Sequence, residues 1–261
     1  MSDPFHDNPD LVACAQLVER ADPERFRAAM AAPVAARAVL FPVYAFNVEV
    51  SRAPWASKEP LIVQMRLQWW SDVLDEIAAG GFVRRHEVVT PLAVATRPEA
   101  LDPLRRVIAA RAVDVDRAPF ADEAALLAYL DATAGALAEG AARSLGATSV
   151  PKAMTTWGRA AGLARYLQAV PELEARGRQP LPDGRPPTLA RLASDSLAAL
   201  DRAGGLRALR RALGPQAAAS VLEFWQARAL LRMVARDPGC VAEGRLRLSE
   251  FGARLRLLAL S

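Results

Sequence analysis

The sequence contains few of the residues from which metal sites and nucleophilic sites are usually built. Among its 261 residues are two cysteines and two histidines. Cys14 and Cys240 lie far apart and lack the close spacing of zinc ligands, so neither a zinc site nor a disulfide framework is expected. His6 and His86 have no triad partner near them in the sequence, so no general base of the common type is predicted. The cysteines and histidines therefore predict no catalytic residue and no metal ligand.

Long apolar runs and basic runs are also absent. The charge-free stretch 38–48 is about half of the roughly 20 residues that a membrane-spanning helix needs. The N-terminus is acidic and lacks the apolar segment of a signal peptide. The formal net charge is +4, and the arginines are distributed along the chain without interleaved aromatic residues. We expect a cytoplasmic protein that binds no nucleic acid and whose membrane contact is peripheral.

What the sequence does contain is the pattern of amphipathic helices. Hydrophobic residues make up 52% of the chain, and they recur at spacings of three and four. We predict an all-α fold in which residues 1–261 form a single domain of about ten helices. The proline-rich stretch 171–187 is predicted to be an extended connection. The candidate helices span 10–19, 23–30, 33–52, 59–79, 86–96, 98–114, 121–144, 152–170, 188–203, 204–213, 215–236 and 249–260.

Three short segments, spaced along the chain, resemble motifs of the squalene/phytoene synthases. The most specific is an arginine followed by a double tryptophan. The resemblance covers most of the chain and implies the isoprenoid-synthase-type helical bundle. The segments are Tyr44-Ala45-Phe46, Met65-Arg66-Leu67-Gln68-Trp69-Trp70, and Gly162 through Gly177-Arg178 to Leu181-Pro182.

That family carries two acidic D-x-x-x-D motifs, which hold the magnesium ions that ionise a substrate diphosphate. A spacing of four residues places two carboxylates on one face of a helix. Counting from Tyr44 and from Gly177, all four positions are uncharged, and the position of a family asparagine is Arg165. The four positions are Ser51, Trp55, Ala169 and Leu173. The resemblance thus implies a protein without magnesium or another cofactor.

The stretches 45–49 and 166–171 resemble one branch of this superfamily, the branch with the mitochondrial respiratory complex I assembly factor, which also lacks the aspartates. The resemblance implies a bacterial-type relative that assists other proteins. We therefore expect a non-catalytic assembly or binding factor with a protein partner at a respiratory membrane complex. Its location would be cytoplasmic, or peripheral to the inner membrane.

Seven residues are candidates for lining a cavity that holds a lipid or isoprenoid ligand. They are Tyr44, Asn47, Glu49, Arg66, Trp70, Tyr129 and Arg178. Each has a structural alternative. Arg66 could hold a diphosphate or pair with Glu49, Trp70 could line a prenyl tunnel or pack in the core, and Arg178 could meet an anion or stabilise a turn.

Two other functions stay open from the sequence. One is an active prenyl transferase with an atypical magnesium site, in which Arg66 would act with Asp72, Asp75 and Glu76. The other is a membrane-surface binder, although no single predicted helix is strongly basic on one side. A solvated helix face is the alternative interpretation of the three acidic residues.

Overall fold

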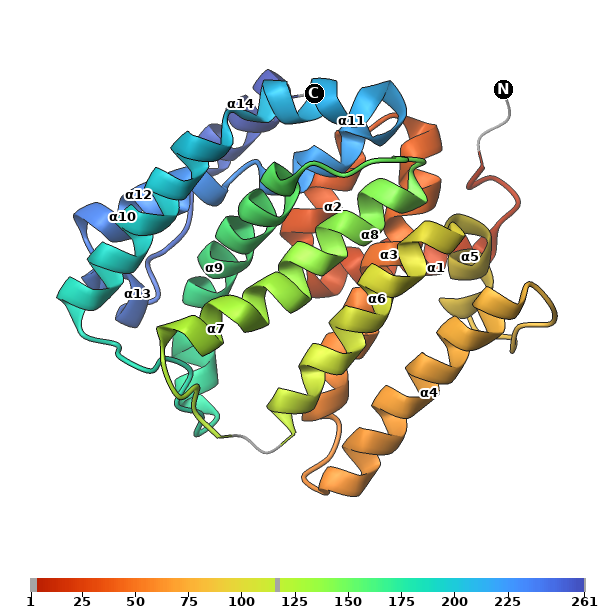
Figure 1. Ribbon diagram of the computed structural model, residues 1–261, viewed down its shortest axis with the longest axis horizontal. Coiled ribbons are helices and arrows are strands. Elements are labelled where there is room, and N and C mark those ends of the chain that lie inside the picture. The colour runs from red at the N-terminus through yellow and green to blue at the C-terminus, as the bar shows by residue number, and fades with distance from the viewer. Residues whose placement is uncertain (1–3, 116–117, 261) are drawn as a thin grey trace.

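The computed structural model describes residues 4–115 and 118–260, and every regular element in these ranges is helical (Figure 1). This confirms the all-α prediction. The helices are α1 (Pro9–Ala21), α2 (Pro23–Met30), α3 (Val34–Arg52), α4 (Pro60–Ala79), α5 (Val89–Ala95), α6 (Pro98–Ala110), α7 (Glu123–Leu130), α8 (Ala136–Ser144), α9 (Lys152–Ala175), α10 (Pro186–Ala203), α11 (Leu206–Ala217), α12 (Ala227–Arg236), α13 (Gly239–Ala242) and α14 (Glu250–Leu260). Short 3₁₀ segments occupy Ala53–Trp55, Arg111–Asp114 and Ala218–Phe224, and a π-helical segment occupies Asp131–Gly135.

Many helix starts follow directly from local sequence. Side chains of Asn8, Asp22 and Asp122 accept hydrogen bonds from backbone N–H groups at the starts of α1, α2 and α7, which satisfies donors that the helix leaves unpaired. Proline occupies the first turn of α1, α2, α4, α6 and α10, where its missing N–H costs nothing. These signals explain why the predicted and observed starts of these helices agree closely. The predicted helix 215–236 is wrong in its first half, because a 3₁₀ segment occupies Ala218–Phe224 and α12 begins only at Ala227.

The prediction of an extended connection over residues 171–187 is partly wrong. Helix α9 continues through Pro171 to Ala175, and α10 begins at Pro186. A proline removes one helical hydrogen bond and can be tolerated when the surrounding helix is held by packing. Val170, directly before this proline, is buried. Tertiary contacts therefore outweigh the local signal.

Helices α3 and α9 are the central helices of the bundle, and α8 packs against both. By length and composition Val34–Trp55 could cross a membrane, alone among the described helices. However, 61% of its apolar window is buried inside the protein. Phe41, Tyr44 and Phe46 are among the largest fully buried side chains. The segment therefore has the burial expected of a core helix.

Small residues let α9 approach the π-helical segment very closely. A Cβ atom added to Gly158 would lie 2.7 Å from the Cα of Gly135, and one added to Gly162 would lie 2.6 Å from the Cβ of Ala134. The predicted helix 121–144 is interrupted here by the π turn, where Thr133 Oγ1 donates to the carbonyl oxygen of Tyr129 at 2.7 Å. The close approach brings the side chains of α7 and α9 to one cavity.

Candidate functional site

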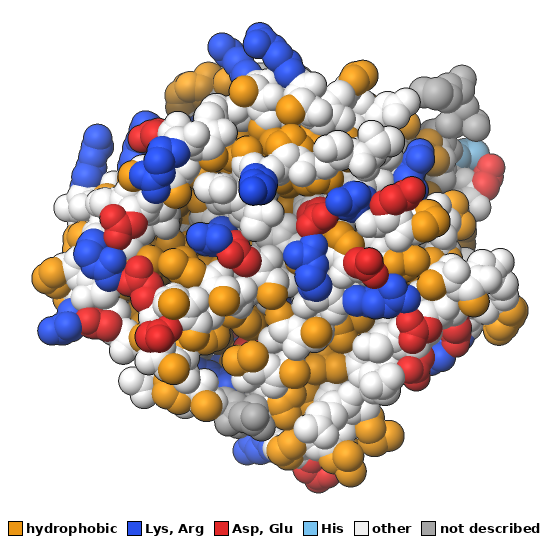
Figure 2. Space-filling model, in the orientation of Figure 1, with side chains coloured by type: hydrophobic (Ala, Val, Ile, Leu, Met, Phe, Trp, Pro, Cys, Tyr) orange, Lys and Arg blue, Asp and Glu red, His pale blue; other side chains and the backbone are white. Residues whose placement is uncertain are grey.

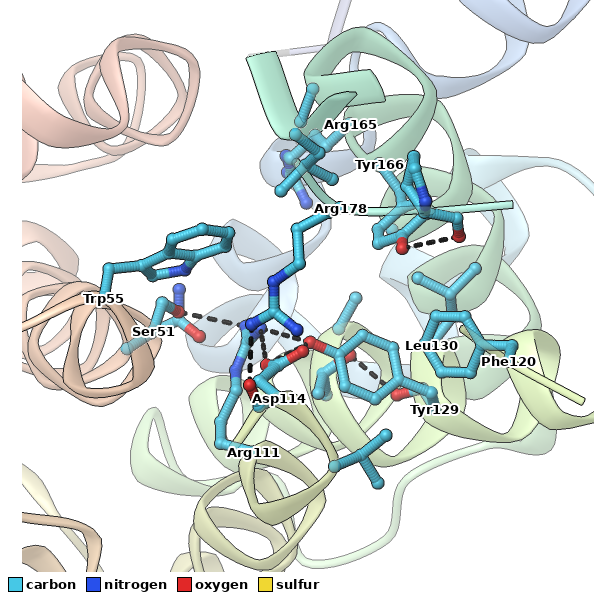
Figure 3. A pocket seen from close by; sticks show the side chains of 18 of the residues that line it. Ser51, Trp55, Arg111, Asp114, Phe120, Tyr129, Leu130, Arg165, Tyr166 and Arg178 are labelled. Atoms are coloured by element: carbon cyan, nitrogen blue, oxygen red, sulfur yellow. Dashed lines mark hydrogen bonds and ion pairs between the residues drawn. The ribbon is translucent and has the colours of Figure 1, made fainter. Parts of the chain in front are cut away.

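A cavity of ≈ 270 Å³ lies between the C-terminal end of α3 and the C-terminal half of α9 (Figure 3). Asn47, Ser51 and Trp55 line one wall, and Arg165, Ala169 and Leu173 line the facing wall. The end of α7, the π turn and the loop after α9 complete it with Tyr129, Leu130, Thr133, Arg178 and Pro180. All four positions counted from the sequence motifs thus border one cavity.

The charged side chains of this cavity are mainly cationic. Among the described residues that line it, four are arginines and one is a carboxylate. Helix α2 supplies Arg25, the 3₁₀ turn after α6 supplies Arg111 and Asp114, α9 supplies Arg165, and the loop after α9 supplies Arg178.

Asp114 lines the cavity and is the centre of a hydrogen-bond network. Its Oδ2 atom accepts from Tyr129 Oη at 2.8 Å and from Arg111 Nη1 at 3.3 Å. Arg111 also donates to Tyr129 Oη at 2.5 Å and to Ser51 Oγ at 3.0 Å. Arg178 extends across the cavity (Figure 3) and donates to the carbonyl oxygen of Asp114 at 2.6 Å. The carboxylate is therefore already engaged by protein donors.

Arg165 is a cation whose side chain is 17% exposed and which its neighbours compensate only in part. Its Nη2 atom donates to the carbonyl oxygen of Glu223 at 2.9 Å and lies 3.4 Å from Glu223 Oε2. Its Nε and Nη1 atoms have neither solvent exposure nor a hydrogen-bond partner among the described residues. Burial, and then the positive charge of Arg25, lower the pKa of Arg165. Such a group favours an anion beside it.

Glu223 is shared between this arginine and a second one. Its side chain is 1% exposed, and its Oε2 atom accepts from Arg25 Nε at 2.9 Å. Arg25 also pairs with Asp22 at 2.5 Å and lies over the Tyr44 ring at 5.7 Å. Asp22 thus pairs directly with Arg25 alone, and Glu223 is the one carboxylate that contacts both Arg25 and Arg165 among the described residues.

An aromatic wall adjoins the cationic one. The Phe120 ring centroid lies 5.1 Å from that of Tyr129 and 6.2 Å from that of Tyr166. On the opposite side, the guanidinium of Arg178 lies 4.9 Å from the Trp55 ring centroid. Aromatic and aliphatic walls beside a few polar groups are typical of sites for ligands with an apolar part.

A family model for squalene/phytoene synthases matches residues 18–254. The chain belongs to the squalene/phytoene synthase family. The solved structures of a dehydrosqualene synthase (TM-score 0.71, 18% identity, 99% of this chain and 98% of that one) and of squalene synthase HpnC from Alicyclobacillus acidocaldarius (TM-score 0.68, 17% identity, 87% and 94%) share its fold. The isoprenoid-synthase-type bundle predicted from the sequence is confirmed.

The chain is also similar to a Drosophila melanogaster protein described as "NADH dehydrogenase (ubiquinone) complex I, assembly factor 6 homolog". The two are 31% identical over 184 residues, which is 65% of this chain and 52% of the relative. The chain thus spans about half the length of the curated relative it matches. The resemblance to the assembly-factor branch, drawn from two short stretches, is confirmed by this match.

The donor set of the cavity does not fit the magnesium ions that the family implies. Magnesium at phosphate-handling sites is held in near-octahedral geometry by one or two carboxylates together with water and substrate phosphates. No group of three His, Cys, Asp or Glu side chains that could hold a metal occurs in the described part of the chain, and Asp114 already accepts from two donors. The four arginines that line the cavity, against one carboxylate among its described lining residues, match an anion instead.

The cavity of this squalene/phytoene synthase family member contains three of the seven predicted residues. Asn47, Tyr129 and Arg178 line it. Tyr44 is 1% exposed and lies behind it, against Arg25.

The other three predicted residues line a different, smaller pocket of ≈ 220 Å³. Glu49, Arg66 and Trp70 border it together with Trp69 and His86. Glu49 and Arg66 form no ion pair with each other. Trp70 is 4% exposed and packs edge-on against Phe46 at 5.4 Å, as the core alternative predicted. The positions of these three residues near the motifs in the sequence did not indicate that they line a different pocket from Asn47, Tyr129 and Arg178.

The acidic residues after the double tryptophan lie on a solvated face of α4. Asp75 pairs with Arg105 at 2.8 Å and Glu76 with Arg84 at 2.5 Å, while Asp72 accepts from Gln68 at 2.7 Å. None of the three lines the arginine cavity. They match the solvated-face interpretation.

Sequence reasoning missed most of the cationic wall. Arg25, Arg111 and Asp114 were not predicted, and Arg165 was noted only as a replaced asparagine. Arg25 and Arg165 are separated by 140 positions, so no local spacing could relate them. The exchange of a family asparagine for Arg165 was the one available signal.

Proposed function

We propose that this family member is a non-catalytic binding protein that acts in the assembly of a respiratory membrane complex. The observation that carries the proposal is the charge of the cavity. Where the family places carboxylates, Ser51, Trp55, Ala169 and Leu173 border the space, and Arg165 lies on the same wall. A prenyl transferase must gather magnesium ions at this point to ionise a diphosphate, and arginines repel such ions.

The ligand that suits this cavity has an anionic head and an apolar body. Guanidinium groups bind phosphate and carboxylate oxygens directly and in fixed geometry. The ring wall of Phe120, Tyr129 and Tyr166 suits a hydrocarbon segment. A lipid or isoprenoid that carries a phosphate or carboxylate group therefore fits, without a metal ion.

The assembly role draws on the similarity to the complex I assembly factor 6 homolog. A protein that retains the fold but uses its cavity only for binding can act by presenting a surface to other proteins, since fold alone does not dictate chemistry. The partner would belong to a respiratory membrane complex. The protein itself would be cytoplasmic and peripheral to the inner membrane.

Catalysis is tested with purified protein, magnesium and farnesyl diphosphate. We expect no release of pyrophosphate. We also expect the diphosphate to raise the melting temperature equally with magnesium and with a chelator, because arginines do the binding. Replacement Arg165→Gln should reduce that rise, whereas Arg20→Gln on the exposed side of α1 should leave it unchanged. Pyrophosphate release, or stabilisation that requires magnesium, would support the active prenyl transferase instead.

The assembly role is tested by affinity capture from native membranes and by deletion of the gene. We expect enrichment of subunits of the respiratory NADH dehydrogenase and a smaller amount of the assembled complex on native gels of the deletion strain. Capture of background proteins alone, with a normal amount of the complex, contradicts the assembly role. It leaves the binding function of the cavity to be judged by the first experiment.

A further inference from the structure

Positive charge is concentrated in the last quarter of the chain. Residues 201–261 contain eleven arginines and five acidic residues, whereas the first 200 residues have slightly more acidic than basic residues. Arginines occur throughout the sequence, but the excess of basic over acidic residues comes from this last part of the chain. In Figure 2, basic side chains project from the upper rim of the molecule, where Figure 1 places α11 and α14.

Helix α14 presents an apolar stripe to solvent. Phe251, Leu255 and Leu258 follow the spacing of one helix face, and their side chains are 79%, 58% and 75% exposed. The helix is attached to the protein through its other side, where Ala253 is 2% exposed. An exposed Phe and Leu stripe on a helix that also carries arginines is typical of helices that lie in a membrane interface.

A hollow of ≈ 600 Å³ adjoins α14 and is separate from the arginine cavity. Four arginines line it: Arg207 on α11, Arg228 and Arg232 on α12, and Arg256 on α14. Its apolar lining includes Trp157, Phe224 and Trp225.

One carboxylate opposes these four arginines. Asp201, also in the lining, pairs with Arg228 at 2.5 Å. Arg207, Arg232 and Arg256 have no ion-pair partner in the described ranges. Three guanidinium groups are thus available to an anion at the edge of the apolar stripe.

We propose that α14 and the adjoining hollow form a docking surface for an anionic lipid membrane. Phe251 and Leu255 enter the interface between head groups and acyl chains, and Arg207, Arg232 and Arg256 bind lipid phosphate groups. Charge complementarity favours an anionic lipid, since basic groups at a membrane surface each add to binding. The continuous exposed stripe of one Phe and two Leu side chains on α14 favours a lipid interface, into which such a helix face can insert.

The proposal is tested by flotation of the full-length protein with vesicles. With equal parts of phosphatidylcholine and phosphatidylglycerol, the protein should float, and high salt should release most of it. With phosphatidylcholine alone, it should stay at the bottom. Failure to float with the anionic vesicles, or equal flotation with both, overturns the proposal. In the first case the surface would fit an acidic protein partner instead.

Matched variants locate the contact. Arg232→Glu with Arg256→Glu should weaken binding on the order of tenfold or more, whereas Arg20→Glu with Lys58→Glu, which changes the net charge equally, should weaken it far less. Phe251→Ser should reduce flotation, and Phe82→Ser, at a side chain that is 87% exposed, should not. Equal effects of target and control variants overturn the proposal.

Two further measurements separate this surface from the cavity and from folding. Arg165→Gln should float like the unmodified protein, because the arginine cavity is not the docking surface. Melting temperatures identify any variant whose loss of flotation comes from unfolding. For the apolar stripe, Leu255→Ser provides a second test should Phe251→Ser fold poorly.

Discussion

Replacing Glu223 by glutamine tests the electrostatic account of the cavity wall. The carboxylate is 1% exposed and accepts hydrogen bonds from Arg25 at 2.9 Å and from Arg165 at 3.4 Å. Glutamine keeps the size of the side chain but removes its charge. Arg25 then retains Asp22, while Arg165 retains one carbonyl oxygen as its only described partner. The Arg165 guanidinium then keeps only Asp22, which forms no direct ion pair with it, as a counter-charge.

The expected loss of stability is large for a conservative change. Breaking a buried ion pair from one side costs about 3–5 kcal/mol. At about 2–4 °C per kcal/mol for a domain of this size, the melting temperature should fall by roughly 6–20 °C. Glu172→Gln is the matched control, because Glu172 is 68% exposed and pairs with Arg176 on the surface of α9. Its loss should stay below about 1 kcal/mol.

Urea unfolding of both variants measures the difference, and a double mutant assigns it. Removing Arg165 as well, in Glu223→Gln/Arg165→Gln, should restore part of the lost stability because no unpaired charge then remains. Inorganic pyrophosphate should also raise the melting temperature of Glu223→Gln more than that of the unmodified protein. If Glu223→Gln is no less stable than Glu172→Gln, the reasoning about Arg165 is refuted.

Two further changes test the packing and the charge pairs around the cavity. Gly158→Ala should destabilise the protein by about 1–3 kcal/mol, because its Cβ would lie 2.7 Å from the Cα of Gly135. Gly81→Ala, which meets no atom within 4 Å, should change urea unfolding little. Burial alone would raise the pKa of Asp22, but Arg25 holds it below 3.8. The ionised form is therefore favoured in the folded state, and its contribution to stability should be lost as the pH falls below about 4. Asp22→Asn should flatten that acid dependence, and an equally steep curve would contradict the assignment.

The limits of sequence reasoning differ between the two halves of the site. On α3, Asn47 and Ser51 lie one helical turn apart, so the periodicity that predicts the helix also predicts that they share a face. Trp55 lies in the 3₁₀ turn that follows α3. On the opposite wall, Pro171 indicated a break, yet α9 continues past it to Leu173. The proline signal is local, whereas the packing that holds the helix is not.

The sequence by itself determined the helical fold, the family and the identity of the residues at the motif positions. Each of these follows from spacing along the chain, through helix periodicity, caps and short motifs. Only the tertiary structure decided that Arg25, Arg111 and Arg165 converge on one cavity, and that Glu49 and Arg66 lie at another.

The same holds for the docking surface at α14. Its charge is collected from α11, α12 and α14, and only their packing brings Arg207, Arg232 and Arg256 to one hollow. The physical reason is that electrostatic interactions depend on distance in space. Contacts between residues far apart in sequence have no periodic signature, so the chemistry of both sites becomes visible only when the helices pack.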